Sequence, residues 1–238
     1  MYISEIFRSF QGEGKLAGVP SVFVRTSGCN LRCVWCDTRY TSWEPEGSDR
    51  AVGDIMAEVR RLVREGEAPV RHAVVTGGEP TLEESLPELC SGLASEGFHV
   101  TIETNATRFL NLDAHLISLS PKLGNSSPLR SPAEIPKSHD ALRNRPEVVR
   151  AYLDAYADPP ARDCQIKFVI EREEDLAEVA EFERAANIPK DKILLMPQSV
   201  EPSDLARKTA WLVDLAAKRG YGFSPRLHIA KYGNRRGV

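Results

Sequence analysis

Short runs of apolar, often β-branched residues alternate along the chain with segments whose apolar residues recur at helical spacing. The runs that we expect to form strands cover residues 21–25, 72–76, 99–104, 116–120, 165–170 and 192–196. Most of them are almost continuously apolar, as expected of strands that are covered on both faces. Alternation of strands with helices is typical of βαβ units and of a mainly parallel sheet. The pattern therefore predicts an α/β protein with six strand–helix units.

Amphipathic helices are predicted between these strands. Residues 54–65 carry apolar side chains at positions i, i+4, i+7 and i+8, and similar spacing recurs over 176–183 and 205–216. Gly220 follows a basic pair and is expected to end the last of these helices.

The stretch 123–162 departs from this alternation because six prolines interrupt it. Within it only residues 146–157 could form a helix. Long insertions of this kind are either functional, for example as a flap or an oligomer contact, or solvated additions to the fold. Both interpretations stay open for this stretch, and the length of 238 residues favours a single domain around it.

Composition and charge narrow the class of protein. The chain is 42% hydrophobic and 27% charged, which argues against disorder, collagen-like repeats and a disulfide-dense scaffold. With 31 basic and 34 acidic residues it has no overall positive field to attract nucleic acid or an anionic membrane. No apolar stretch approaches the roughly 18 residues of a membrane span, and the first residues do not resemble a leader. We expect a cytoplasmic protein.

Three of the five cysteines lie in one short loop after the first predicted strand. Cys29, Cys33 and Cys36 have the spacing C-x3-C-x2-C, whereas Cys90 and Cys164 stand apart in apolar segments. A structural zinc site needs a fourth protein ligand. Three cysteines with one open position suit an iron–sulfur cluster in which one iron is left for a non-protein ligand. Zinc remains the alternative at this point.

This loop resembles the hallmark of the radical S-adenosylmethionine enzymes. In that family the three thiolates hold a 4Fe-4S cluster, the fourth iron binds S-adenosylmethionine, and reductive cleavage of this cofactor yields a 5'-deoxyadenosyl radical. A full TIM barrel has eight strand–helix units, and the six predicted here fall short of it. We therefore expect an incomplete, TIM-type (β/α)6 barrel of this superfamily.

The ends of the later predicted strands resemble the family's cofactor contacts. The Gly-Gly-Glu-Pro segment at 77–80 resembles the part that meets the methionine amino group, although alone it could be an ordinary strand-to-helix turn. The resemblance implies cofactor contacts at Gly77, Gly78, Glu79, Glu103, Ser120, Pro121, Lys122, Met196 and Gln198. Lys167 lies inside a predicted strand, where a lysine usually faces solvent, so its part in the site stays open.

The N-terminal Phe-Gln-Gly-Glu-Gly segment at 10–14 and the basic C-terminus narrow the resemblance to the 7-carboxy-7-deazaguanine synthase family of the queuosine and 7-deazapurine pathway. This implies radical ring contraction of 6-carboxy-5,6,7,8-tetrahydropterin to 7-carboxy-7-deazaguanine, with loss of ammonia. It also implies a homodimer, an electron donor such as flavodoxin or ferredoxin, and no nucleic-acid or membrane partner. The tail at 222–238 would lie on the substrate side.

Several residues of these segments suit a carboxylated pterin. Glu13 could accept hydrogen bonds from the guanidine-like edge of the pterin, and Arg25 could bind its carboxylate. The alternatives are that Glu13 is a solvated loop acid and that Arg25 forms a structural ion pair. The resemblance implies substrate contacts at Phe10, Gln11, Gly12, Glu13, Arg25, Thr76, His228 and Val238, with Glu103, Lys122 and His228 as catalytic candidates. Thr38 matches the family's Mg²⁺-binding hydroxyl, but could simply cap the next turn.

Two other functions remain to be excluded. An enzyme that installs a glycyl radical on a partner protein would carry the same cysteine loop, but the Gln-Gly-Glu-Gly segment at 11–14 favours the synthase. A zinc-stabilised binding module is a rival of a different class. It would contain no iron and would not turn over S-adenosylmethionine.

Overall fold

The computed structural model describes residues 1–65, 70–128, 138–158 and 161–238. Within these residues nine strands form one sheet, in the order β3-β1-β2-β4-β5-β6-β7-β8-β9. From β2 to β9 every neighbouring pair is parallel. The parallel strands are β2 (Pro20–Thr26), β4 (His72–Gly77), β5 (His99–Thr104), β6 (Leu116–Leu119), β7 (Asp163–Ile170), β8 (Ile193–Pro197) and β9 (Gly222–Phe223). All six predicted strands are present among them.

Two further strands lie beyond β2 at one end of the sheet. β1 (Tyr2–Phe10) pairs with β2 in the antiparallel sense, and β3 (Ser48–Asp49) pairs with β1. Neither was predicted, because Ser, Glu and Arg break up the apolar residues of β1 and because β3 has only two residues. The two ends of the sheet, β3 and β9, do not pair with each other, so the barrel is open. The prediction of an incomplete α/β barrel is confirmed.

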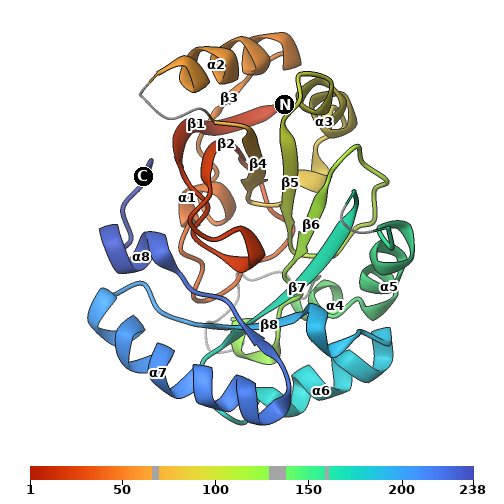
Figure 1. Cartoon of the computed structure of the whole chain (residues 1–238), viewed down its shortest axis with the longest axis vertical. Helices are drawn as coiled ribbons and strands as arrows, with labels where there is room; N and C mark the ends of the chain where they lie inside the picture. The colour runs from red at the N-terminus through yellow and green to blue at the C-terminus, as the bar shows by residue number, and fades with distance from the viewer. Residues whose placement is uncertain (66–69, 129–137, 159–160) are drawn as a thin grey trace.

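Helices surround the curved sheet on its outer side (Figure 1). The long ones are α2 (Val52–Arg64), α3 (Leu86–Ser95), α5 (Pro146–Ala155), α6 (Asp175–Ala186) and α7 (Pro202–Arg219). The short ones are α1 (Arg39–Ser42), α4 (Ser138–Arg143) and α8 (Leu227–Tyr232), with 3-10 turns at Gly14–Leu16, Pro80–Leu82, Gly124–Ser126 and Lys190–Lys192. Gly220 ends α7 in the left-handed conformation, as predicted. No helix in the described part of the chain is long and apolar enough to span a membrane.

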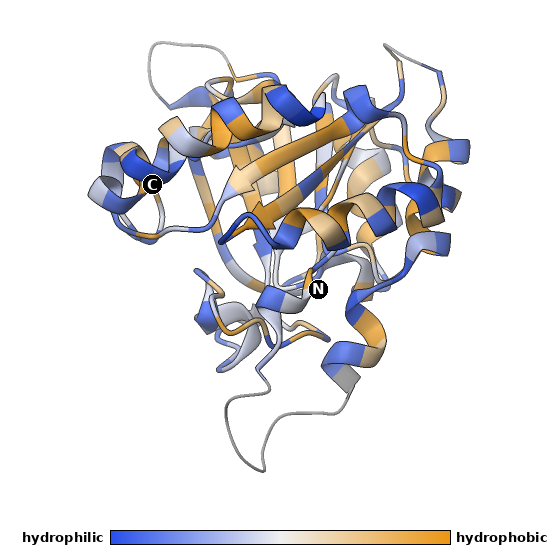
Figure 2. Ribbon diagram, turned by 90° about the horizontal axis from the view of Figure 1, so that it is seen from below, coloured by the Kyte–Doolittle hydropathy of each residue, from blue (hydrophilic) through white to orange (hydrophobic). Residues whose placement is uncertain are grey.

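The core lies between the sheet and these helices, and apolar residues dominate the strands (Figure 2). Side chains alternate between the two faces of a strand. In β7, Ile166 and Phe168 point outward into the core, whereas Lys167 and Val169 point inward and line a cavity. The same alternation in β2 directs Arg25 inward. The period of the strands thus decides which polar residues reach the interior.

The described part of the proline-rich stretch packs against the barrel. α5 confirms the predicted helix within 146–157, and it buries Val149, Tyr152 and Tyr156. The hydroxyl of Tyr156 donates to the backbone oxygen of Leu112 at 2.7 Å. α4 was not predicted, because it has only six residues and directly follows the proline-rich segment. Residues 129–137 lie outside the described part.

Candidate active site

A cavity of about 560 Å³ opens at the carboxyl ends of the parallel strands. Its volume falls within the usual range of small-molecule sites. The wall includes most of the residues predicted from sequence, namely Phe10, Gln11, Gly12, Glu13, Arg25, Cys29, Cys33, Cys36, Thr38, Thr76, Gly77, Gly78, Glu103, Ser120, Lys122, Met196, Gln198, His228 and Val238. Glu79 and Pro121 are the two predicted site residues that are not part of it.

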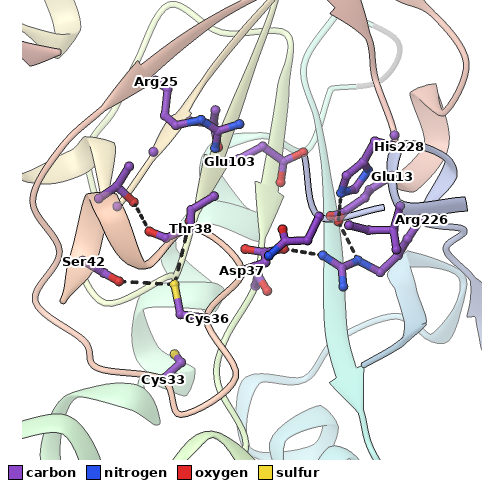
Figure 3. Close-up of a pocket in the computed structure, with 18 of the residues that line it drawn as sticks. Glu13, Arg25, Cys33, Cys36, Asp37, Thr38, Ser42, Glu103, Arg226 and His228 are labelled. Atoms are coloured by element: carbon purple, nitrogen blue, oxygen red, sulfur yellow. Dashed lines mark hydrogen bonds and ion pairs between the residues drawn. The ribbon is translucent and has the colours of Figure 1, made fainter. Parts of the chain in front are cut away.

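The three clustered cysteines line one side of this cavity. The Cys36 sulfur lies 3.2 Å from the Ser42 hydroxyl and 3.8 Å from the Thr38 hydroxyl (Figure 3). The indole N–H of Trp43 donates to the Cys33 carbonyl at 3.1 Å. The other two cysteines, Cys90 in α3 and Cys164 in β7, are buried in the apolar core and do not reach the cavity.

The thiols are held in an environment that disfavours their charged form. Burial raises the pKa of Cys29 to about 11 and that of Cys33 to about 12. Thiolates are the form that ligates metal, so they require a cation beside them. Within the described residues, no group of three His, Cys, Asp or Glu side chains is arranged to hold a metal ion. The three cysteines nevertheless line the same cavity of about 560 Å³.

The glycine pair at the end of β4 packs directly against the start of the cysteine loop. Gly77 has a φ of +142°, which favours glycine, and a Cβ on Gly78 would lie 2.0 Å from the carbonyl oxygen of Gly28. The backbone N–H of Glu79 donates to that same oxygen at 2.8 Å. The glycines are therefore required for close contact between two backbones, and they also line the cavity.

The side chain of Glu79 faces away from the cavity, although its predicted role was a cofactor contact. Its Oε1 accepts from the backbone N–H and the hydroxyl of Thr81 and from the Thr104 hydroxyl, and its Oε2 accepts from the backbone N–H of Asn105 at 2.6 Å. With four such bonds and 1% exposure, Glu79 caps the following turn and fixes the end of β5. The sequence left open an ordinary turn after this strand, and the Glu79 side chain serves such a turn.

Lys122 and Gln198 follow the carboxyl ends of β6 and β8, the two strands on either side of β7. The Lys122 ammonium donates to the backbone oxygen and hydroxyl of Ser120, at 2.8 and 2.7 Å, and lies 5.9 Å from the centre of the Trp35 ring. Lys208 donates to the Gln198 carbonyl at 2.7 Å. Local contacts thus hold both segments at the rim.

A buried lysine joins two acids on the opposite side of the cavity. The Lys167 ammonium lies 2.7 Å from Glu13 Oε2 and 2.8 Å from Glu103 Oε2, and its side chain is 2% exposed. Gln11 donates to the other oxygen of Glu103 at 3.0 Å. The sequence left open which side Lys167 faces, and in the structure it occupies an inward position of β7 and lines the cavity. Glu13 is 18% exposed and ion-paired, so it is not a solvated loop acid.

Arg226 extends this charged cluster and was missed in the sequence. Its Nε donates to Glu13 Oε1 at 3.2 Å, one Nη donates to the Ser199 carbonyl at 2.5 Å, and the other pairs with Asp37 (Figure 3). Asp37 directly follows Cys36, and Arg226 stands two residues before His228. Their nearness to motif residues was the only signal that could have identified them.

The charged cluster is stabilised in its ionised form. Burial disfavours the charge of Glu13, but attraction to Lys167 and Arg226 outweighs burial and holds its pKa well below the usual range. Burial also opposes the charge of Lys167, and Glu103 and Glu13 nevertheless raise its pKa. For Asp37 burial is the largest single influence and opposes its charge, but the attraction of Arg226, together with His228 and Arg25, lowers the pKa. These groups are all charged near neutral pH.

Arg25 is anchored at one nitrogen and faces the cavity. Its Nε donates to Glu5 at 2.6 Å, and the Tyr40 hydroxyl donates to the same oxygen at 3.0 Å. The alternative of a structural ion pair is therefore correct for this nitrogen, while the guanidinium lines the cavity and extends toward Glu103 (Figure 3). Arg236 of the C-terminal tail pairs with the other oxygen of Glu5 at 3.3 Å.

The tail brings His228 against the N-terminal loop. The backbone N–H of Leu227 donates to the Gly12 carbonyl at 2.9 Å, and a Cβ on Gly12 would lie 2.0 Å from His228 Nδ1. His228 Nε2 is 3.9 Å from Glu13 Oε1, and burial lowers the pKa of the imidazole. Thr38 precedes α1, but its hydroxyl makes no capping hydrogen bond there.

Comparisons with known proteins agree on one family. The model of the radical SAM superfamily matches residues 23–155. A protein named 7-carboxy-7-deazaguanine synthase from Rhodopirellula baltica is 40% identical over 100% of this chain and 89% of its own length. One of the same name from Halobacterium salinarum is 40% identical over 98% of this chain and 90% of its own. The crystal structure of QueE from Escherichia coli has a TM-score of 0.63 at 27% identity, covering 95% of this chain and 94% of that one.

Proposed function

The chain belongs to the 7-carboxy-7-deazaguanine synthases of the radical SAM superfamily, and on that basis we propose which of its residues hold the cofactors and the pterin. Its reaction is the radical-mediated ring contraction of 6-carboxy-5,6,7,8-tetrahydropterin to 7-carboxy-7-deazaguanine, with loss of ammonia. The observation that carries the residue assignment is that the three cysteines and the loop at 11–14, from separate parts of the chain, line the same cavity.

Cys29, Cys33 and Cys36 would hold the 4Fe-4S cluster. Their donor set fits this group, since these three cysteines line the same cavity and three thiolates leave one iron of the cluster open for a non-protein ligand. A zinc site would need a fourth ligand, and neither Cys90 nor Cys164 reaches the cavity. When bound, the reduced cluster and S-adenosylmethionine supply the radical that removes a hydrogen atom from the pterin.

The strand ends next to the cysteine loop would bind S-adenosylmethionine. Gly77 and Gly78 expose their backbone, and Lys122 offers an ammonium that suits the methionine carboxylate. Cavity-lining residues of this group are Gly77, Gly78, Glu103, Ser120, Lys122, Met196 and Gln198. Glu79 would act indirectly, by fixing Thr104 and Asn105 at the end of β5.

The charged side of the cavity would bind the pterin. The Arg25 fork suits its carboxylate, and the partly buried carboxylates of Glu13 and Glu103 suit the N–H donors of its other edge. Lys167 orients both acids, and Arg226 holds Glu13. The remaining contacts in this proposal are Phe10, Gln11, Gly12, Thr76, His228 and Val238.

The hydroxyl of Thr38 would provide the protein ligand to Mg²⁺. Magnesium prefers oxygen ligands and keeps several waters, so one hydroxyl together with substrate oxygens makes a reasonable shell. The hydroxyl lines the cavity and makes no capping hydrogen bond to α1, which leaves it available. Removal of Mg²⁺ with a chelator would then raise the KM for the pterin and leave the iron content unchanged.

Partners and location complete the proposal. The enzyme acts on a small molecule and needs a reductant, for which a flavodoxin or ferredoxin is the proposed source. The family resemblance favours a homodimer and involves no nucleic acid. Free thiols and a reduced cluster suit a reducing compartment, so we place the enzyme in the cytoplasm.

The test is anaerobic reconstitution with iron and sulfide, followed by S-adenosylmethionine, a reductant and 6-carboxy-5,6,7,8-tetrahydropterin. We expect about four irons per chain and formation of 7-carboxy-7-deazaguanine. Cofactor cleavage without this product would refute the substrate assignment and keep the superfamily. An absence of iron uptake would refute the cluster assignment as well.

A further inference from the structure

A buried histidine of the insertion contacts the backbone of the cysteine loop. His139, from α4, is 1% exposed, and its Nδ1 accepts a hydrogen bond of 3.0 Å from the backbone N–H of Arg32, which lies between the first two cysteines. On the other side of the ring, Nε2 lies 3.2 Å from the hydroxyl of Ser126. That hydroxyl donates in turn to the carbonyl of Leu123 at 2.6 Å. A chain of hydrogen bonds therefore runs from the cysteine loop through the ring to the end of β6.

The partners fix the tautomer of this ring. A backbone N–H can only donate, so Nδ1 must be unprotonated and Nε2 must carry the hydrogen that is given to Ser126. The Ser126 hydrogen is directed to Leu123, so each donor in the chain meets one acceptor. Burial lowers the pKa of His139, which agrees with a neutral ring. The imidazole is thus a fully satisfied link between two loops.

Two more hydrogen bonds join the same two segments. The backbone N–H of Val34 donates to the Ser126 carbonyl at 3.0 Å, and the indole N–H of Trp35 donates to the Asn125 carbonyl at 3.0 Å. Residues 28–38 contain neither helix nor strand, so contacts from outside the loop determine its conformation. Of the three links, the one through His139 is the one that depends on a side chain of the insertion.

We infer that His139 is a positioning residue for the iron–sulfur cluster, which it serves by fixing the backbone between Cys29 and Cys33. This inference rests on the proposed assignment of the three cysteines as ligands. Groups that orient ligands are important for both the retention and the properties of a metal centre. Hydrogen bonds near the sulfurs also set the potential of a cluster, and the Arg32 N–H is directed away from them by its bond to His139.

The test compares three variants. His139→Ala removes the acceptor, whereas His139→Asn can place an amide oxygen near the position of Nδ1. Ser127→Ala is the matched control, because the Ser127 hydroxyl joins the same insertion to Asp140 at 2.8 Å without reaching the cysteine loop. The measurements are amide hydrogen exchange at Arg32 in the cluster-free protein, iron per chain after reconstitution, and the electron paramagnetic resonance spectrum and midpoint potential of the reduced cluster.

For His139→Ala we expect exchange at Arg32 to be about tenfold faster, as the loss of one buried hydrogen bond implies. Iron retention should fall, and the spectrum and potential of the remaining cluster should shift. His139→Asn and Ser127→Ala should resemble the unmodified protein. Unchanged exchange and an unchanged spectrum in His139→Ala would overturn the inference. So would equal losses in His139→Ala and His139→Asn, because the effect would then not depend on the acceptor.

Failure of the inference is separable from failure of the proposed function. If Cys33→Ala keeps its iron, the ligand assignment is wrong, while the exchange result at Arg32 still tells whether His139 fixes the loop. If the cluster forms and the product appears but His139→Ala behaves like the unmodified protein, only the inference fails.

Discussion

The two sides of the cavity are built in opposite ways. The sulfur side, formed by Cys29, Cys33 and Cys36, lies on a loop without regular structure that backbone hydrogen bonds hold in place. The charged side is anchored by Lys167, which the strand period directs inward and which pairs with two partly buried acids at 2.7 and 2.8 Å. The sulfur side therefore needs an added cation to become stable in its ionised form, whereas the charged side is already organised before anything binds.

The charged side also has an unbalanced charge. The carboxylates of Glu13, Glu103 and Asp37 face the cations of Lys167 and Arg226, so three negative groups meet two positive ones. The excess negative charge suits a ligand edge that carries several N–H donors. Arg25 supplies a separate positive group for the ligand carboxylate. Recognition of the pterin and radical chemistry should thus be separable by mutation.

The largest effect is expected on the sulfur side. Cys33→Ala should abolish both the cluster and all turnover, because two thiolates cannot replace three as ligands of the cluster. Cys90→Ala is the control, since Cys90 is buried in α3 away from the cavity and should affect stability alone. Iron analysis and product formation measure both. Equal loss of iron in the two variants would show that the ligands are misassigned.

A smaller but still large effect is expected when the charged side is broken. Lys167→Met leaves two partly buried acids without the cation that orients them toward the pterin, and we expect kcat/KM to fall about a hundredfold, which corresponds to about 3 kcal/mol of lost transition-state binding. Iron content should stay normal. Lys15→Met is the control, because Lys15 pairs with Asp163 at the other end of β7 and is more exposed. Steady-state kinetics with varied pterin concentration measure this change in kcat/KM. A parallel loss of iron would contradict the separation of the two sides.

The glycine contact tests how tightly the sulfur side is held. Gly78→Ala places a methyl group against the Gly28 carbonyl, at a separation of 2.0 Å without adjustment, and should destabilise the loop by about 1–3 kcal/mol. Gly92→Ala is the matched control, since its Cβ would lie 3.5 Å from the Met56 sulfur. The midpoint temperature of thermal unfolding and the iron retained per chain should both decrease in Gly78→Ala but not in Gly92→Ala. Normal iron retention there would mean that the loop can shift freely.

The smallest effect on activity is expected at the far end of the sheet, where His72 begins β4. Burial lowers its pKa from 6.5 to about 4, with a further contribution from His99, and its ring nitrogens bond to Ser21 and Thr101 at 2.7 and 2.8 Å. The neutral ring therefore contributes stability that is fully present above pH 6.5. It is lost as the pH falls toward 4, by about 3 kcal/mol in total.

Chemical unfolding of His72→Gln between pH 7.5 and 4.5 measures this contribution. The variant should be less dependent on pH than the unmodified protein, and its kcat at neutral pH should be unchanged, because His72 is distant from the cavity wall. An equally steep pH dependence of stability in both proteins would show that His72 does not cause it.

Much of the fold followed from the sequence, because continuous apolar runs and helical spacing are local signals. Strands β1, β3 and β9 did not, since β1 is mixed in polarity and the two edge strands β3 and β9 have two residues each. Nearly all of the predicted site residues lie on the cavity wall, and they make up about half of it. The sequence could not show whether Lys167 faces inward, nor that Arg226 reaches Asp37 across the barrel, because both depend on strand register and on the docking of the tail.

The division of the cavity can be measured directly as two footprints of amide hydrogen exchange on the reconstituted protein. S-adenosylmethionine alone should protect residues 76–79 and 120–123, and later addition of 6-carboxy-5,6,7,8-tetrahydropterin should protect 11–14 and 226–229. The account predicts that Lys167→Met keeps the first footprint and loses the second. Protection by the pterin confined to the sulfur side, or a second footprint that survives in Lys167→Met, would contradict it.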